Sequence, residues 1–117
     1  MKSKMRTTAT IMLMVVVCLG MAGAAPKKIV IGITMQGNQS GFIQYITAGM
    51  WEWQKSNAPD VTLKVVFADD DATKQLTQVE TFVAQKVDAI IINPVDKVQS
   101  AAAVDIAAQA KIPILTV

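Results

Sequence analysis

Residues 28–50, KIVIGITMQGNQSGFIQYITAGM, predict the fold of the chain. Residues 29–33 are β-branched and apolar apart from Gly32, which is typical of a strand buried on both faces. A polar loop at 36–41 follows, and apolar residues then recur every three or four positions, as in a helix; they are Phe42, Ile43, Ile46, Met50 and Trp53. Strand, open loop and helix form the first unit of an open α/β sheet, in which ligands bind at the carboxyl ends of the strands.

The first 24 residues have the composition of a secretory signal peptide. Three Lys and Arg residues precede an apolar segment at 11–21 and the small-residue pattern Ala22-Gly23-Ala24. We expect cleavage after Ala24, export to the periplasm, and a mature part of residues 25–117. The alternative is an uncleaved membrane anchor, but the apolar run at 9–25 is 17 residues long, at the short limit for spanning a bilayer.

Removing this leader changes the charge of the chain. The full sequence has 11 Lys and Arg against 9 Asp and Glu, a net charge of +2. Three of the basic residues lie in the leader, so the mature part has a net charge of −1 and contains no arginine. This composition predicts no nucleic-acid partner and argues against phosphate recognition. The single cysteine, Cys18, also lies in the leader, and the bulky Val17 before it disfavours lipid attachment.

Four strands and three helices are expected to alternate along the mature chain. After the first strand, the pattern predicts a helix ending at 55–57, a strand at 61–67, a helix at 72–86, a strand at 87–92, a helix at 98–110 and a strand at 112–117. Helical connections of this length require parallel strands and right-handed crossovers. The predicted fold class is therefore α/β, a doubly wound, Rossmann-like parallel sheet. Because the sequence stops inside the fourth strand, we expect a truncated lobe of a longer protein.

The loop after the first strand is the candidate binding site. Asn38, Gln39 and Ser40 each donate and accept hydrogen bonds, and Phe42 follows at the start of the helix. Amides beside an aromatic ring suit a sugar, whose hydroxyls need both kinds of partner and whose C–H face packs on a ring. In the alternative interpretation Ser40 is only a helix N-cap and Phe42 belongs to the core. The local pattern alone favours this second interpretation.

Other kinds of site find little support in the sequence. The loop lacks the Lys-Ser or Lys-Thr of a phosphate-binding loop, and no GxGxxG is present. Asp69-Asp70-Asp71 could begin a calcium loop, but Lys74 stands where that loop needs glycine, so we predict a strand-end carboxylate and a helix cap. The chain has no histidine. We therefore expect no bound metal, no cofactor and no enzymatic activity.

Three further aromatic residues fall within the first predicted helix. Tyr45, Trp51 and Trp53 are expected to pack against the protein rather than to stack on a ligand, because large aromatic side chains are mostly buried.

Four blocks of the sequence together carry a family resemblance. They are KIVIGIT, SGFIQYITAGM, FADDDATKQLTQVETFVAQKVDAIIINPVD and IPILTV. In this order they resemble the amino-terminal lobe of a type I periplasmic binding protein, in the ribose-binding-like group of sugar ABC transporters. The resemblance extends over residues 28–117. It implies two similar lobes that close on one ligand.

The resemblance also implies positions for the ligand contacts. The family's first loop usually carries two adjacent aromatic residues against the sugar ring; Phe42 matches the first, and Ile43 replaces the second. Ser40, with Gln39 beside it, matches the polar residue before that pair. The predicted ligand-binding residues are therefore Asn38, Gln39, Ser40 and Phe42. A further acidic or amide contact would follow Val117 directly.

The function implied by the resemblance is capture of a monosaccharide or related polyol in the periplasm, for delivery to an ABC transporter permease. The alternative is an extracytoplasmic sensing module of the same fold, in chemoreception, autoinducer binding or sensor-kinase input. Contact with the membrane would occur only through the leader or the permease. With half a cleft and an unfinished sheet edge, residues 25–117 alone are expected to be marginally stable or to aggregate, and to bind no sugar tightly.

Overall fold

The computed structural model describes Gly23 and residues 25–117. The predicted signal peptide, residues 1–24, lies outside the described residues apart from Gly23. The elements alternate as predicted: β1 (Ile29–Met35), α2 (Gly41–Asn57), β2 (Val61–Phe67), α3 (Ala72–Ala84), β3 (Ala89–Ile92), α4 (Lys97–Gln109) and β4 (Ile114–Thr116). Within the described part of the chain, no helix combines the length and the apolar character needed to cross a membrane.

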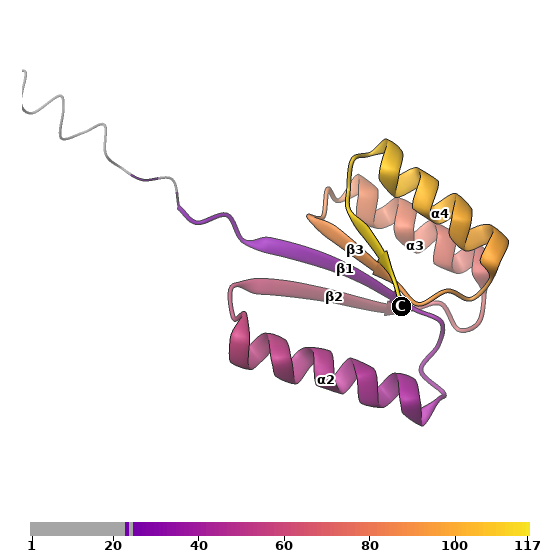
Figure 1. Ribbon diagram of the computed structural model, residues 1–117, viewed down its shortest axis with the longest axis horizontal. Helices are drawn as coiled ribbons and strands as arrows, with labels where there is room; N and C mark the ends of the chain where they lie inside the picture. The colour runs from indigo at the N-terminus through magenta and orange to yellow at the C-terminus, as the bar shows by residue number, and fades with distance from the viewer. Residues whose placement is uncertain (1–22, 24) are drawn as a thin grey trace, which may run out of the picture.

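The strands form one parallel sheet in the order β2-β1-β3-β4 (Figure 1). Helix α2 lies on one face of the sheet, whereas α3 and α4 lie side by side on the other. The predicted doubly wound α/β fold is confirmed. The loops after β1 and β3 lead to helices on opposite faces, so they diverge and leave a crevice where β1 and β3 end.

Each face of the sheet has its own apolar cluster. The cluster under α2 contains buried Ile33, Met35 and Ile43. The cluster on the other face contains buried residues of α3, β3 and α4 together with Val87, namely Val79, Phe82, Val87, Ile90, Ile92, Ala103 and Ala107. The sheet is therefore covered on both faces, as buried parallel strands require.

Several boundaries differ from the sequence-based prediction. Strand β1 continues to Met35, α3 ends at Ala84 rather than 86, and β3 begins at Ala89 rather than 87. Lys86 adopts a left-handed φ of 54°, which ends the helix. Asp88 then bonds β1 through its backbone and its side chain: its N–H donates to Val30 O at 2.8 Å, and its Oδ2 accepts from Val30 N at 2.8 Å.

Only part of the apolar face predicted for α2 packs against the sheet. Ile43 is buried and Ile46 and Met50 are half-buried, whereas Phe42 is 69% exposed and Trp53 is 63% exposed. The expectation that the other aromatic residues pack is also wrong, since Tyr45 is 80% and Trp51 44% exposed. The helix presents only a narrow stripe to the sheet, and these aromatic residues lie beside or opposite that stripe.

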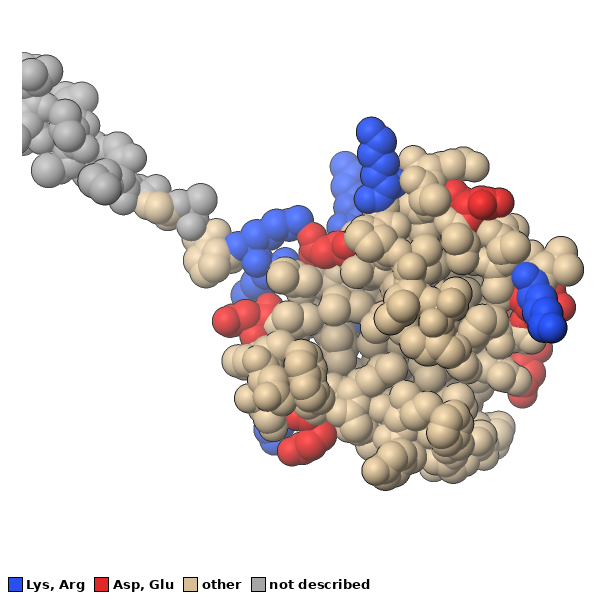
Figure 2. Space-filling model, in the orientation of Figure 1, with Lys and Arg blue, Asp and Glu red and all other residues tan. Residues whose placement is uncertain are grey.

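Charged residues of both signs are interspersed over the face shown in Figure 2, with uncharged surface between them. In the part of the chain that the structure describes, two lysines pair with carboxylates: Lys27 with Asp88 and Lys74 with Asp69. This face therefore presents no continuous field of a single sign.

Gly32 allows helix α3 to pack directly on β1. A Cβ atom at this position would lie 2.6 Å from atoms of the Phe82 ring, and that ring is only 4% exposed. The missing side chain thus makes room for the aromatic ring in the core.

We predict that Gly32→Ala lowers the free energy of unfolding by about 1–3 kcal/mol, because the Phe82 ring must move to accept the methyl group. Urea denaturation measures this change. Gly49→Ala is the matched control, since a Cβ there meets nothing within 4 Å and α2 gains a better helix former. Equal stability of Gly32→Ala and the wild type would contradict the packing described here.

The ion pair at the start of the sheet should make stability depend on pH. The hydrogen bond from the Lys27 ammonium, followed by that from Val30 N–H, lowers the pKa of Asp88 below its ordinary value of 3.8. A carboxyl group with a lowered pKa stabilises the fold above its unfolded pKa, and this contribution is lost as the pH falls through the folded pKa.

We therefore expect the difference in unfolding free energy between wild type and Asp88→Asn to be constant above about pH 5 and to shrink at pH values below 3.8. Chemical denaturation at a series of pH values checks this. Lys27→Met removes the main cause of the shift and should weaken the same pH dependence. A difference that stays constant down to pH 2 would refute the assignment.

Candidate functional site

The carboxyl ends of β1, β2 and β3 lie at the same end of the sheet. The segments that follow these strands surround a hollow of about 410 Å³, here called the strand-end pocket. Its lining residues are Gln36, Gly37, Gln39, Ser40, Phe42, Ile43, Asp70 and Asn93. A larger hollow of about 690 Å³ runs along α3 beside β2. We assign the candidate ligand site to the strand-end pocket because it occupies the crevice between the loops after β1 and β3, which lead to helices on opposite faces of the sheet.

The loop after β1 is held by its neighbours on both sides. Gln36 N donates to Asn93 Oδ1 at 3.3 Å, and Gln36 O accepts from Asp70 N at 2.9 Å. Ala68 N also donates to Met35 O at 2.9 Å. The three strand ends are thus joined by hydrogen bonds beyond those of the sheet itself.

Three of the four predicted binding residues line the strand-end pocket, and Asn38 does not. Asn38 instead supports the loop: its carbonyl oxygen accepts from Gln44 Nε2 at 2.8 Å, and its Oδ1 accepts from Gln39 Nε2 at 3.0 Å. The bond from Gln39 leaves that residue's own carbonyl oxygen free to accept from a ligand.

Ser40 and Phe42 combine features of both sequence-based interpretations. Ser40 is the N-cap of α2, and its Oγ accepts from Phe42 N at 3.2 Å. Its hydroxyl hydrogen remains able to donate. The alternative that places Phe42 in the core is wrong, because this side chain is 69% exposed and lines the pocket.

The sequence-based list missed Gln36, Asp70 and Asn93. Asp70 follows β2, and Asn93 follows β3 directly, so both stand at strand ends. Applying the strand-end rule to every strand, not only to the first, would have found them. The predicted helix cap among the three aspartates is confirmed at Asp71, whose Oδ1 accepts from Lys74 N at 3.0 Å.

Asp69 and Asp70 hold an uncommon backbone conformation. Their φ angles are 54° and 60°, in the left-handed region that residues other than glycine seldom adopt. Asp70 N–H nevertheless bonds Gln36 O, as described above, and the Asp70 carboxylate lies beside Gly37. The two left-handed residues thus turn one carboxylate into the pocket.

Two glutamines of helix α3 form hydrogen bonds with the strand ends that surround the pocket. Gln75 is only 2% exposed; its Nε2 donates to Asn93 O at 2.8 Å, and its Oε1 accepts from Val95 N at 2.9 Å. Gln78 Nε2 donates to Phe67 O at 2.9 Å and its Oε1 accepts from Thr34 Oγ1 at 2.6 Å. These side chains fix the ends of β1, β2 and β3 relative to one another.

The pocket offers hydrogen-bonding amides, one hydroxyl, one carboxylate and an exposed aromatic ring. Within the described residues, no three His, Cys, Asp or Glu side chains are grouped as metal ligands would be. The lining is suited to a small, neutral ligand with several hydroxyl groups.

The fold agrees with the sequence family of the chain. Residues 31–117 match the family model described as the periplasmic binding protein domain, and the chain belongs to this family. It is similar to the ABC transporter periplasmic-binding protein YphF of Escherichia coli, with 36% identity over 118 residues, covering 98% of this chain and 36% of that protein. It is also similar to the ribose import binding protein RbsB of Bacillus subtilis, with 30% identity, covering 78% of this chain and 29% of that protein.

Solved structures give the same result. An ABC transporter solute binding protein from Bacillus halodurans with bound myo-inositol matches with a TM-score of 0.72 and 35% identity, over 80% of this chain and 32% of that chain. The periplasmic binding protein of an arabinose ABC transporter from Shewanella, bound to L-arabinofuranose, matches with a TM-score of 0.67 and 30% identity, over 74% and 28%. The chain therefore spans about a third of the length of these relatives.

We predict that Gln75→Leu lowers the free energy of unfolding by about 1–3 kcal/mol, because it leaves the Val95 N–H and the Asn93 carbonyl without their buried partner. It should also accelerate hydrogen exchange at the Val95 amide, measured by NMR. Gln109→Leu, on the exposed end of α4, is the matched control. Unchanged exchange at Val95 in Gln75→Leu would show that this side chain does not hold the loop.

Proposed function

We propose that residues 25–117 form the amino-terminal lobe of an ABC transporter's solute-binding protein, which captures a monosaccharide or related polyol. The observation that carries this proposal is the strand-end pocket, where neutral amides, one carboxylate and an exposed aromatic ring meet at the carboxyl edge of the sheet. The names of the similar proteins favour transport over the sensory alternative.

The pocket chemistry fits a polyol group by group. Gln36 and Gln39 carry amides that accept from one hydroxyl and donate to another. The Asn93 amide already accepts from Gln36 N and donates to Val117 O, which leaves it one donor hydrogen and one lone pair for a ligand. The Asp70 carboxylate only accepts, and its hydrogen bonds with hydroxyls are charge-assisted and strong. The Phe42 ring, exposed beside these groups, would pack on the C–H face of the sugar.

The remaining parts of the proposal concern the whole protein. Residues 1–24 would act as a signal peptide that directs the chain to the periplasm, as the composition of the leader predicts. The other face of the ligand would contact a second lobe, and the loaded protein would deliver the ligand to a permease. We propose binding and release without chemical change, in keeping with a family of solute-binding proteins.

An NMR titration of the purified chain with D-ribose, L-arabinose and myo-inositol tests the site. We expect saturable shifts of the Gln36, Ser40 and Asn93 amides with one of these ligands. The dissociation constant should be on the order of 1 mM, because one lobe covers one face of the ligand only. Shifts scattered over the whole chain, or none with any polyol, would contradict the proposed site.

We predict that Phe42→Ala and Asp70→Asn each weaken this binding about tenfold, since each removes a direct contact worth roughly 1 kcal/mol or more. Tyr45→Ala is the control for the first, because Tyr45 is an exposed aromatic residue on the same helix outside the pocket. Asp60→Asn, in an exposed turn, is the control for the second. Equal weakening by a variant and its control would remove that residue from the site.

A further inference from the structure

Strand β2 forms one edge of the sheet, and its backbone alternates between β1 and the outside. Ala68 N–H bonds Met35 O in β1, so residues 62, 64 and 66 also face β1. Residues 61, 63, 65 and 67 therefore direct their N–H and C=O groups outward. Bonds at both ends agree with this parity, because Val61 N donates to Ala58 O, and Gln78 Nε2 donates to Phe67 O from α3.

The outward carbonyl oxygens are bonded at both ends of β2 and open at its centre. Val61 O accepts from Gln54 Nε2 at 2.8 Å and Phe67 O accepts from Gln78 Nε2 at 2.9 Å. Among the described residues, no hydrogen bond reaches the outward N–H and C=O groups of Leu63 and Val65. These four groups are the hydrogen-bonding pattern to which another extended strand can pair.

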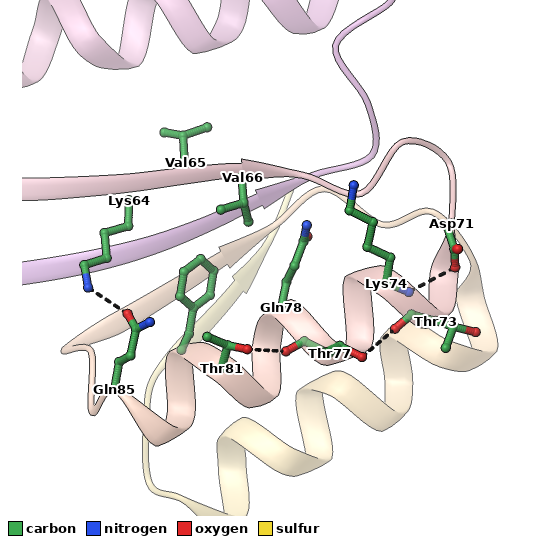
Figure 3. Close-up of a pocket in the computed structure, with 11 residues that line it drawn as sticks. Lys64, Val65, Val66, Asp71, Thr73, Lys74, Thr77, Gln78, Thr81 and Gln85 are labelled. Carbon is green, nitrogen blue, oxygen red and sulfur yellow. Dashed lines mark hydrogen bonds between the residues drawn. The ribbon is translucent and has the colours of Figure 1, made fainter.

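A groove runs beside this open edge. It is the hollow of about 690 Å³ between β2 and α3, and Figure 3 shows Val66, Gln78 and Thr81 around it. Val66 and Phe82 give it an apolar floor, and the threonines of α3 form its far wall. An incoming strand would place every second side chain in this groove.

Lys64 stands at one end of the groove, and no carboxylate in the described part of the chain pairs with it. Its Nζ donates to Gln85 Oε1 at 2.7 Å, a neutral amide (Figure 3). The other lysine of the groove, Lys74, is paired with Asp69. A carboxylate arriving opposite Lys64 would therefore find a cation free to pair with it.

We propose that the edge of β2 and this groove bind an extended acidic–apolar peptide segment of a partner protein. The segment pairs antiparallel with Leu63 and Val65. An acidic residue lies directly opposite Lys64, and an apolar residue two positions earlier lies opposite Val66, over the apolar floor. Positions opposite Lys64 and Val66 are not hydrogen-bonded pairs, so their side chains come closest there.

A second copy of the chain is a poorer occupant than an acidic segment. When two β2 strands pair antiparallel so that Leu63 of each meets Val65 of the other, the two Lys64 side chains stand directly opposite each other. Like charges in that position destabilise a strand pair. A lysine on an edge strand also discourages unselective pairing.

This surface is separate from the strand-end pocket and does not depend on the proposed sugar ligand. The groove and the pocket share no lining residue. Peptide binding can therefore be measured whether or not a polyol binds.

The test is an NMR titration of the purified chain with the capped peptide Thr-Val-Leu-Thr-Glu-Thr-Val, whose leucine precedes its glutamate by two positions. We expect shifts and exchange protection at the Leu63 and Val65 amides. Replacing the glutamate by lysine should weaken binding about three- to tenfold, and Lys64→Glu should reverse this preference. Lys55→Glu, on α2 across the sheet, is the matched control and should leave the preference unchanged.

N-methylated peptides test the pairing without altering the protein. Methylation of the fourth and sixth residues blocks the edge facing β2 and should abolish binding, whereas methylation of the third and fifth should not. Absence of protection at Leu63 and Val65, or equal effects of the two methylation patterns, would overturn the proposal. Protection of these amides without peptide, together with the mass of a dimer, would assign the edge to a second copy instead.

Discussion

The arrangement of the loops at the carboxyl ends of the strands depends on the hydrogen bonds of the buried Gln75 amide. It bonds the backbone on both sides of Pro94, at Asn93 O and Val95 N, and so joins helix α3 to the loop that leaves β3. Asn93 in turn receives the N–H of Gln36, which begins the loop after β1. A side chain on one helix thus sets the position of two loops, and those loops form the walls of the strand-end pocket.

The helices on the two faces of the sheet pack in different ways. On the face of α3 and α4, close packing is achieved with small residues: Gly32 accepts the Phe82 ring, and alanines at 103 and 107 are fully covered. On the other face, α2 packs on the sheet through Ile43, Ile46 and Met50, and Phe42 at its N-terminal end lines the pocket. The second face thus contributes an accessible aromatic side chain to the pocket.

Local patterns predicted the order of the elements because each depends on neighbours in sequence. The limits of β2 and the N-cap at Ser40 follow from alternation and from capping chemistry, and both agree with the structure. Asp70 and Asn93 were not predicted as pocket residues because the strand-end rule was applied to the first strand alone; their distance from Gln36 depends in addition on the spatial order of the strands. The exposure of Phe42 could not be read from helical spacing, which places it next to the buried stripe without showing how wide that stripe is.

The left-handed pair Asp69 and Asp70 has a consequence for affinity. Such conformations cost about 1–2 kcal/mol per residue, and the fold bears this cost whether or not a ligand is present. The backbone that carries the Asp70 carboxylate is held by the bond from Asp70 N to Gln36 O, so binding at the proposed site would lose little entropy in ordering this loop. At the proposed site, selectivity would then rest on which hydroxyl group of the ligand reaches the Asp70 carboxylate.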